Sequence, residues 1–130
     1  LPEAAGRIYS FGTDLRIWLL KGEMGTGKTT FVHALTDRLG IHDPVSSPSY
    51  ALVHEYLKTE KERIYHFDLF RVRSVAEIFD IGMDEYLDSG HLCLIEWPEL
   101  LEPYLEGQYL SIHFDNPEGE KRIFTVKTHE

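Results

Sequence analysis

The chain has 130 residues, of which 42% are hydrophobic, and a formal net charge of −9. This length predicts one domain with its own core, spanning residues 1–130, and is too short for two domains of ordinary size. The acidic balance argues against a protein that grips a DNA or RNA backbone by itself, because such binding depends on Lys and Arg neutralising phosphates. Any role in nucleic-acid chemistry is therefore expected to go through a partner.

The cysteine and histidine content also limits the class of protein. The single cysteine, Cys93, lies among apolar residues, cannot form an internal disulfide, and is predicted to be a small buried hydrophobe. This fits a reducing cytoplasm. No apolar run approaches the length of a membrane span and no signal-type segment is visible, so no membrane is expected. The seven histidines lack zinc-site spacing, and no structural zinc is expected.

In chain order, the first predicted element is a short helix from Pro2 to Tyr9. The apolar run from Ile17 to Leu20 is typical of a strand that is buried on both faces of a sheet. Residues 22–29, G-E-M-G-T-G-K-T, follow at once, and apolar residues then recur at helical spacing from Phe31 to Leu39. Strand, glycine-rich loop and helix in this order are the context of a phosphate-binding loop.

The residue types of this loop explain the chemistry that it predicts. Gly22, Gly25 and Gly27 permit the backbone conformations that turn N–H groups toward phosphate oxygens. Lys28 is expected to reach the β and γ phosphates, and the Thr29 hydroxyl is expected to join the shell of a Mg²⁺ ion. The N-terminus of the following helix adds partial positive charge to the same site. The sequence therefore predicts nucleotide binding.

The segment from 41 to 50 is polar, contains two prolines and has no periodicity, and is predicted to be a loop. In nucleotide-hydrolysing folds a hydroxyl-rich loop at this place often lies near the γ phosphate, while a plain surface linker is the alternative. Two predicted strands, Ala51 to Leu57 and Arg63 to Asp68, are joined by a short charged tip and must be antiparallel. Asp68 then stands at a strand end, with Arg71 just beyond it.

The run Ser74 to Glu77 has the S-x-x-E form of a capping box and predicts a short helix, with another turn from Met83 to Leu87. His91 to Glu96 is typical of a second central strand. Four apolar residues followed by Glu96 form the pattern of a Walker B strand, whose carboxylate faces Mg²⁺ and the attacking water. Any buried strand that leads into a charged loop shares this pattern. Trp97, which follows, either packs as core or covers the site.

The last predicted element is a β-hairpin, because residues from Gln108 to Phe114 and from Lys121 to Lys127 alternate apolar and polar side chains around a turn. The elements together predict an α/β fold. Its form would be a three-layer P-loop NTPase-like domain with a mixed, partly antiparallel sheet flanked by helices.

Four separated blocks of the chain match one known set of motifs. Residues 22–30 follow G-x-L-G-x-G-K-T-T with Met24 for leucine, and residues 46–50, S-S-P-S-Y, stand for T-S-P-T-[FY]. Residues 66–71, H-F-D-L-F-R, match H-x-D-L-Y-R with phenylalanine for tyrosine, and residues 95–99 match I-E-W-P-E throughout. The chain thereby resembles the bacterial TsaE (formerly YjeE) family, the ATPases of tRNA threonylcarbamoyladenosine biosynthesis. The first block is shared by many ATPases, whereas the third and fourth together are far more specific.

The resemblance implies a protein that binds ATP and Mg²⁺ and works with partners of the TsaB and TsaD kind, which install threonylcarbamoyl on adenosine 37 of tRNAs. The tRNA would be reached only indirectly, through that complex, and the preference for ATP over GTP comes from the resemblance alone. The predicted catalytic residues are Lys28, Glu96, Asp68 and Ser49, with Ser49 as γ-phosphate sensor. The predicted nucleotide-binding residues are Gly22, Met24, Gly25, Thr26, Gly27, Lys28, Thr29, Thr30 and Trp97, and the predicted metal ligands are Thr29, Glu96 and Asp68.

A loop cradle, one lysine, one Mg²⁺ and one carboxylate are a nearly complete set for phosphoryl transfer to water, and the missing part is a charge-stabilising arginine. Arg71 is a candidate, although an ion pair with Glu77 is an alternative use for it. We therefore expect slow hydrolysis in isolation, accelerated when a partner orders residues 46–50. Two other functions stay open: a small P-loop kinase, and a nucleotide-gated protein-binding module that does not need hydrolysis.

Overall fold

The fold was obtained as a computed structural model, which describes residues 2–23, 25–41, 46–49, 52–115 and 123–130. The strands are β1 (Ile17–Lys21), β2 (Ser46–Ser49), β3 (Val53–Leu57), β4 (Arg63–Asp68), β5 (Leu92–Glu96), β6 (Tyr109–Asp115) and β7 (Ile123–His129). The helices are α1 (Pro2–Phe11), α2 (Lys28–Arg38), α3 (Val75–Asp80) and α4 (Met83–Leu87), with a 3₁₀ turn η1 (Glu102–Tyr104).

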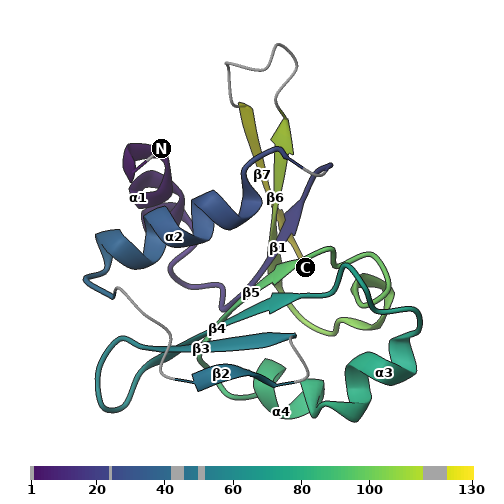
Figure 1. Ribbon diagram of the computed structural model, residues 1–130. Coiled ribbons are helices and arrows are strands. Elements are labelled where there is room, and N and C mark those ends of the chain that lie inside the picture. The colour runs from purple at the N-terminus through teal and green to yellow at the C-terminus, as the bar shows by residue number, and fades with distance from the viewer. Residues whose placement is uncertain (1, 24, 42–45, 50–51, 116–122) are drawn as a thin grey trace.

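The centre of the sheet is parallel and both of its sides are antiparallel. The strand order is β2-β3-β4-β5-β1-β6-β7 (Figure 1). Each neighbouring pair within β4-β5-β1-β6 is parallel, whereas β3 pairs antiparallel with β4 and with β2, and β7 pairs antiparallel with β6. The predicted mixed sheet, its antiparallel pair and its closing hairpin are confirmed. Short connections force antiparallel neighbours, while helical crossovers permit the parallel ones.

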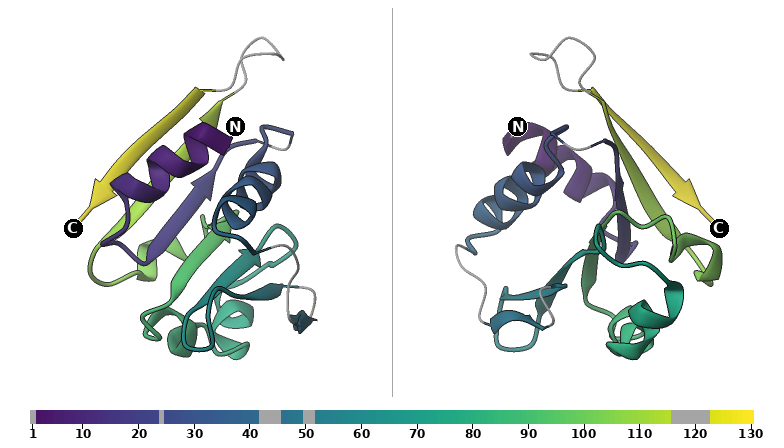
Figure 2. Two further views of the ribbon diagram at one scale, coloured as in Figure 1. Left: turned by 90° about the vertical axis from the view of Figure 1, so that its left-hand side faces the viewer. Right: turned by 45° about the vertical axis from the view of Figure 1, so that its right-hand side comes forward.

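Helices cover both faces of the sheet, which gives the predicted three layers (Figure 2). In β1, Trp18 and Leu20 pack on the side of α1 and α2, whereas Leu19 belongs to the apolar cluster on the side of α3, α4 and η1. All three are fully buried. Alternate side chains of one strand thus enter two separate apolar clusters, as expected for a strand without a solvent face.

One predicted element is wrong. The segment from 41 to 50 was expected to be a loop, yet Ser46–Ser49 forms β2, which pairs antiparallel with β3 through Ser46 and Glu55 and through Ser49 and Val53, with a register shift between them. β2 is the edge strand of the sheet. An edge position and an irregular register are the circumstances in which a strand tolerates proline, here Pro48. The strand was not predicted because its polar composition is not typical of strands, and a strand that pairs on one side only does not require an apolar one.

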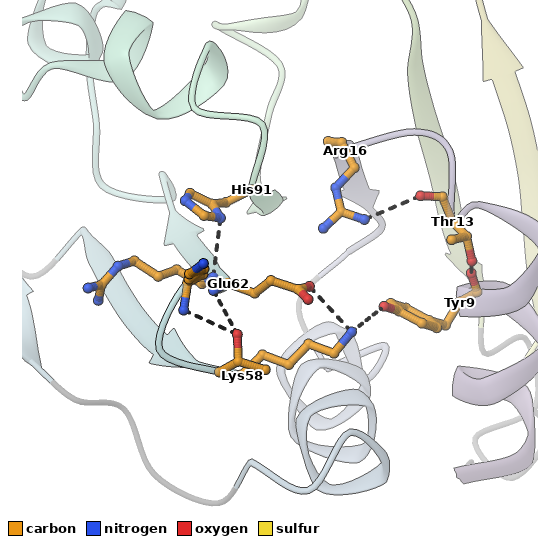
Figure 3. A network of polar contacts seen from close by, with 9 residues as sticks. Tyr9, Thr13, Arg16, Lys58, Glu62 and His91 are labelled. Carbon is orange, nitrogen blue, oxygen red and sulfur yellow. Dashed lines mark hydrogen bonds and ion pairs between the residues drawn. The ribbon is translucent and has the colours of Figure 1, made fainter.

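A polar network joins the β3–β4 hairpin to α1 (Figure 3). The Lys58 Nζ donates a hydrogen bond to the Tyr9 hydroxyl at 3.1 Å and lies 3.5 Å from the Glu62 carboxylate. The hydrogen bond to Tyr9 is the main reason why the pKa of Lys58 is raised. The first helix, predicted from Pro2 to Tyr9 and found from Pro2 to Phe11, is thereby attached to the sheet.

Two smaller predictions are also confirmed. The Ser74 hydroxyl accepts a hydrogen bond from the Glu77 backbone N–H at 3.4 Å, and this N-cap begins α3. Cys93 is a buried free thiol whose pKa burial raises to about 12. Among the described residues, no helix has the length and apolar character required to cross a bilayer.

Candidate functional site

Three parallel strands end at the same edge of the sheet, and each end carries a residue of the candidate site. β1 ends at Lys21, directly before the glycine-rich loop, while β4 ends at Asp68 and β5 ends at Glu96. Glu96 is paired in register with Asp68 on one side and with Leu20 on the other. Because the carboxyl ends of parallel strands lie together, motifs far apart in the sequence meet here.

The loop between β1 and α2 requires glycine at Gly22. Its φ is 147°, and a Cβ there would lie 2.8 Å from the Phe114 carbonyl oxygen and 2.9 Å from the Thr26 hydroxyl. Gly27, with a φ of 98°, is the N-cap of α2, and its carbonyl accepts the first hydrogen bond of the helix from the Phe31 N–H at 2.8 Å. The loop thus leads directly into a helix N-terminus, where backbone N–H groups favour anions.

Lys28, the first residue of α2, lies beside Trp97. Its Nζ donates a hydrogen bond to the Gly22 carbonyl and lies 3.4 Å from the centroid of the Trp97 ring. Only 4% of the lysine is exposed. Burial lowers the pKa of Lys28, and the nearby Glu96 carboxylate opposes this effect. The amine thus lies inside the site, next to an aromatic face and a carboxylate.

Thr29 and Glu96 connect the start of α2 to the end of β5. The Thr29 hydroxyl lies within hydrogen-bond distance of both Glu96 oxygens, at 3.2 Å from Oε1 and 3.1 Å from Oε2. Glu96 is buried, with 3% of its surface exposed, and His66 lies on the other side of its carboxylate. Two of the three residues predicted to hold a metal are thus adjacent, although 66 residues separate them along the chain.

Asp68 and two aromatic side chains form the mouth of the site. The exposed Asp68 accepts a hydrogen bond from the Phe70 N–H at 3.1 Å through Oδ1. The Phe70 and Trp97 rings lie 4.9 Å apart, centroid to centroid. Trp97 has a φ of 57°, which is rare for a residue other than glycine and typical of functional sites.

Trp97 lines two cavities. One, of about 370 Å³, is lined by Gly25, Gly27, Lys28, Thr29, Thr30, Asp68, Phe70, Glu96 and Trp97. The second, of about 620 Å³, is lined by Lys21, Gly22, Glu23, Thr26, Trp97, Glu99, His113, Phe114 and Asp115. Since both touch the glycine-rich loop, an elongated ligand can contact both sides of that loop.

The donor set of the first cavity fits Mg²⁺. Its candidate ligands are a hydroxyl, from Thr29, and the carboxylates of Glu96 and Asp68. Mg²⁺ takes hard oxygen ligands and, in nucleotide sites, is bound through one or two protein groups together with phosphates and water. The described residues include no cluster of three or more His, Cys, Asp or Glu side chains suited to a metal. The chemistry therefore suits a metal that arrives with a phosphate ligand.

The structure brings most of the predicted site residues into or beside these cavities. Met24 and the Ser49 side chain lie outside the described part of the structure, so their predicted roles stay predictions. Arg71 is exposed and, within the described residues, forms no ion pair with Glu77 and lines neither cavity. Sequence reasoning gave no role to His66 or to Phe70. Both belong to the H-F-D-L-F-R block, and His66 stands two residues before Asp68 on the same strand face.

Comparison with known proteins agrees with this geometry. Residues 2–124 match the family described as "Threonylcarbamoyl adenosine biosynthesis protein TsaE". The chain is 34% identical to a tRNA threonylcarbamoyladenosine biosynthesis protein TsaE from Rickettsia typhi over 112 residues, which are 85% of this chain and 76% of that protein. It is 35% identical to the TsaE of Bacillus subtilis over 106 residues, which are 82% of this chain and 65% of that protein.

A solved structure supports the same relationship. The crystal structure of Bacillus subtilis YdiB superposes with a TM-score of 0.69 at 26% sequence identity, covering 98% of this chain and 80% of that one. The likeness thus covers nearly the whole chain. The chain belongs to the TsaE family of tRNA threonylcarbamoyladenosine biosynthesis proteins.

Proposed function

We propose that this chain binds ATP with Mg²⁺ between the glycine-rich loop and Glu96, hydrolyses it slowly, and so supports threonylcarbamoylation of adenosine 37 by TsaB-like and TsaD-like partners. The observation that carries the proposal is the contact between the Thr29 hydroxyl and both Glu96 oxygens, at 3.1 and 3.2 Å. This contact brings a Walker A hydroxyl and an acidic strand end to one point, where a metal–phosphate ligand needs oxygen donors.

The chain's own groups have separate tasks in this proposal. The N–H groups of the loop and of the first turn of α2 bind phosphate oxygens, and Lys28 adds a positive charge near them. Mg²⁺, held by Thr29 and Glu96 with help from Asp68, would neutralise charge that develops on the phosphates. Because the Glu96 carboxylate is buried, its orientation is restricted, which favours accurate placement over flexibility.

The second cavity is the space that we assign to the nucleoside. It is lined by Gly22 and Thr26 of the loop, whereas Glu96 lines the first cavity, and Trp97 lines both. A phosphate chain bound along the loop would therefore have its two ends in different cavities. His113 and Phe114 of β6 also line this cavity.

The described residues that line the two cavities include no arginine, which supports slow hydrolysis over kinase activity. Kinases and fast NTPases use such a residue to stabilise the charge of the transferred phosphoryl group, with effects of about 10³ to 10⁵ in rate where it has been removed or supplied. A partner that supplies this charge, or that orders residues 46–50, would then control turnover.

The test compares the unmodified chain with Glu96→Ala. We expect the unmodified chain to hydrolyse ATP well below about ten turnovers per second, an ordinary enzyme rate. Glu96→Ala should abolish turnover while ADP remains bound, because the loop and Lys28 still contact the phosphates. Glu85→Ala, on the exposed surface of α4, is the matched control and should behave as the unmodified chain. Phosphate release and equilibrium nucleotide binding are the measurements.

The other outcomes are equally specific. Retained turnover in Glu96→Ala would remove that carboxylate from the mechanism. Turnover at the ordinary rate without partners would contradict partner control. Transfer of the γ phosphate to a metabolite with water excluded would favour the kinase. Partner binding that neither Glu96→Ala nor a nonhydrolysable ATP analogue alters would favour the nucleotide-gated binding module.

A further inference from the structure

His66 holds the carboxylate that the proposed function places at the metal. The His66 Nε2 lies 2.5 Å from Glu96 Oε2, and the side chains are only 7% and 4% exposed. A carboxylate that holds a cation only accepts hydrogen bonds, so in the proposed metal-binding state the Nε2–H of the imidazole is the donor. A buried carboxylate without donors is strongly disfavoured, and this contact supplies one of the strongest types of hydrogen bond.

The register between β4 and β5 explains why His66 contacts Glu96 from the interior side. On β4, Ile64 belongs to the apolar cluster beneath α2, so His66 and Asp68, two and four residues further on, share that face. Asp68 is paired with Glu96, whereas His66 is paired with Leu94, one step deeper in the sheet. His66 is therefore the diagonal neighbour of Glu96, on the interior side, while Asp68 stands beside it at the solvent end.

The Thr29 and His66 hydrogen bonds to Glu96 are affected differently when a cation binds. Thr29 has a single hydroxyl proton, which its contacts with both Glu96 oxygens must share. If the Thr29 oxygen becomes a metal ligand, that hydroxyl is no longer dedicated to the carboxylate. The His66 Nε2–H has no such second task, because it lies in the protein interior and lines neither cavity.

We propose that His66 is a positioning residue, which fixes the Glu96 carboxylate in the orientation that binds Mg²⁺ with the nucleotide. The inference rests on the proposed function, since it assigns His66 a role toward the same metal. Groups that hydrogen-bond a metal ligand from outside orient it, and their loss typically weakens metal affinity or activity by about 10- to 100-fold. His66 does not contact the phosphate site itself, because it lines neither cavity.

The test uses three variants. His66→Leu removes the donor and keeps an apolar filler, whereas His66→Gln places an amide N–H near the position of Nε2. The control is His54→Leu: His54 is paired with His66 on β3 and its ring lies 5.9 Å away, so it shares the surroundings without contacting Glu96. Binding of ADP is measured calorimetrically with and without Mg²⁺, beside thermal unfolding of each variant.

We expect His66→Leu to weaken the Mg²⁺-dependent part of ADP binding by about 10- to 100-fold, with metal-free ADP binding changed by less than about threefold. His66→Gln should recover most of the loss, and His54→Leu should bind as the unmodified chain. A His66→Leu protein with unaltered Mg²⁺ dependence would overturn the inference. So would a His66→Gln protein as impaired as His66→Leu at equal thermal stability, since a packing role alone would then suffice.

A second measurement separates this inference from the proposed function. In the nucleotide-free protein labelled with ¹⁵N at histidine, the His66 Nε2–H should give a slowly exchanging resonance that is lost or shifted in Glu96→Ala. A resonance unaffected by that substitution would overturn the pairing of His66 with Glu96. Nucleotide binding by the unmodified chain that shows no Mg²⁺ dependence would overturn the proposed function and the metal role of His66, whatever the resonance shows.

Discussion

Gly22 shows how one residue of the loop is determined by its surroundings as well as by its backbone. Its φ of 147° is a conformation that glycine adopts without strain and that other residues rarely adopt. In addition, a Cβ at this position would collide with the Phe114 carbonyl and the Thr26 hydroxyl. Gly25 also has a positive φ, 82°, yet nothing lies within 4 Å of the position of its Cβ. The two glycines therefore differ in a way that the sequence motif does not reveal.

This difference predicts unequal effects of the same substitution. Gly25→Ala should destabilise the fold by about 1 kcal/mol, the strain of a left-handed backbone. Gly22→Ala should add about 1–3 kcal/mol for the collision with the backbone of β6, and should also weaken ADP binding because the loop must shift. Urea unfolding and nucleotide titration of both variants measure this. Equal losses in the two variants would show that the close contact at Gly22 is relieved without cost.

Still at the residue scale, the sequence alone was enough to predict that certain side chains meet, where the strand topology determines their positions. Lys28, Thr29 and Glu96 meet because a loop after one central strand and the end of the next strand must share an edge. His66 could not be assigned a partner in this way. Its contact with Glu96 depends on the register between β4 and β5, which a single sequence does not specify.

At the scale of elements, η1 is attached to two strands through Glu102. Its carboxylate lies 2.7 Å from the Lys21 Nζ at the end of β1 and accepts a hydrogen bond from the Tyr109 hydroxyl on β6 at 2.9 Å. Partial burial acts to raise the pKa of Glu102, but the hydrogen bonds from Lys21 and Tyr109 outweigh it, and the pKa is lowered from its usual 4.5. The 3₁₀ turn therefore depends on an ionised carboxylate.

This contact gives the stability of the fold a dependence on pH. A carboxyl group whose pKa is lower in the folded state stabilises the fold above its unfolded pKa, and this stabilisation is lost as the pH falls through the folded pKa. We expect a loss of about 1 kcal/mol below pH 4.5, in line with partly exposed ion pairs. Glu102→Gln should remove this component. Unfolding free energies of both proteins, measured at several acidic pH values, test it, and parallel curves would contradict it.

Most elements could be predicted because their patterns agreed with their environments. Central strands such as β1 are continuously apolar, and the capping box before α3 has the local geometry that it predicts. β2 escaped prediction because an edge strand is paired on one side only and does not need an apolar run. Ser46–Ser49 lies in the sheet because it pairs with β3. Such a contact between segments cannot be predicted from the residues of the strand alone.

At the scale of the whole molecule, the negative net charge of this chain argues against direct binding of tRNA, although its family takes part in tRNA modification. With 13 basic and 22 acidic side chains, it lacks the excess of cations that binding a nucleic-acid backbone requires. We predict that the chain alone does not bind tRNA detectably at physiological ionic strength, because non-specific affinity for nucleic acid comes from that excess. Filter binding with labelled tRNA at about 0.15 M salt measures this. Micromolar or tighter binding, weakening steeply with added salt, would contradict it.

The placement of the two tryptophans gives the molecule a built-in optical probe. Trp18 is fully buried in the core, where its indole N–H donates to the Leu15 carbonyl at 2.9 Å. Trp97 is half-buried and its ring faces the Lys28 ammonium. Fluorescence from Trp18 therefore follows the integrity of the core, whereas fluorescence from Trp97 follows the charge at the phosphate loop. Replacing Trp18 with phenylalanine would leave Trp97 as the one tryptophan of the chain, so that emission excited selectively at tryptophan reports on that loop.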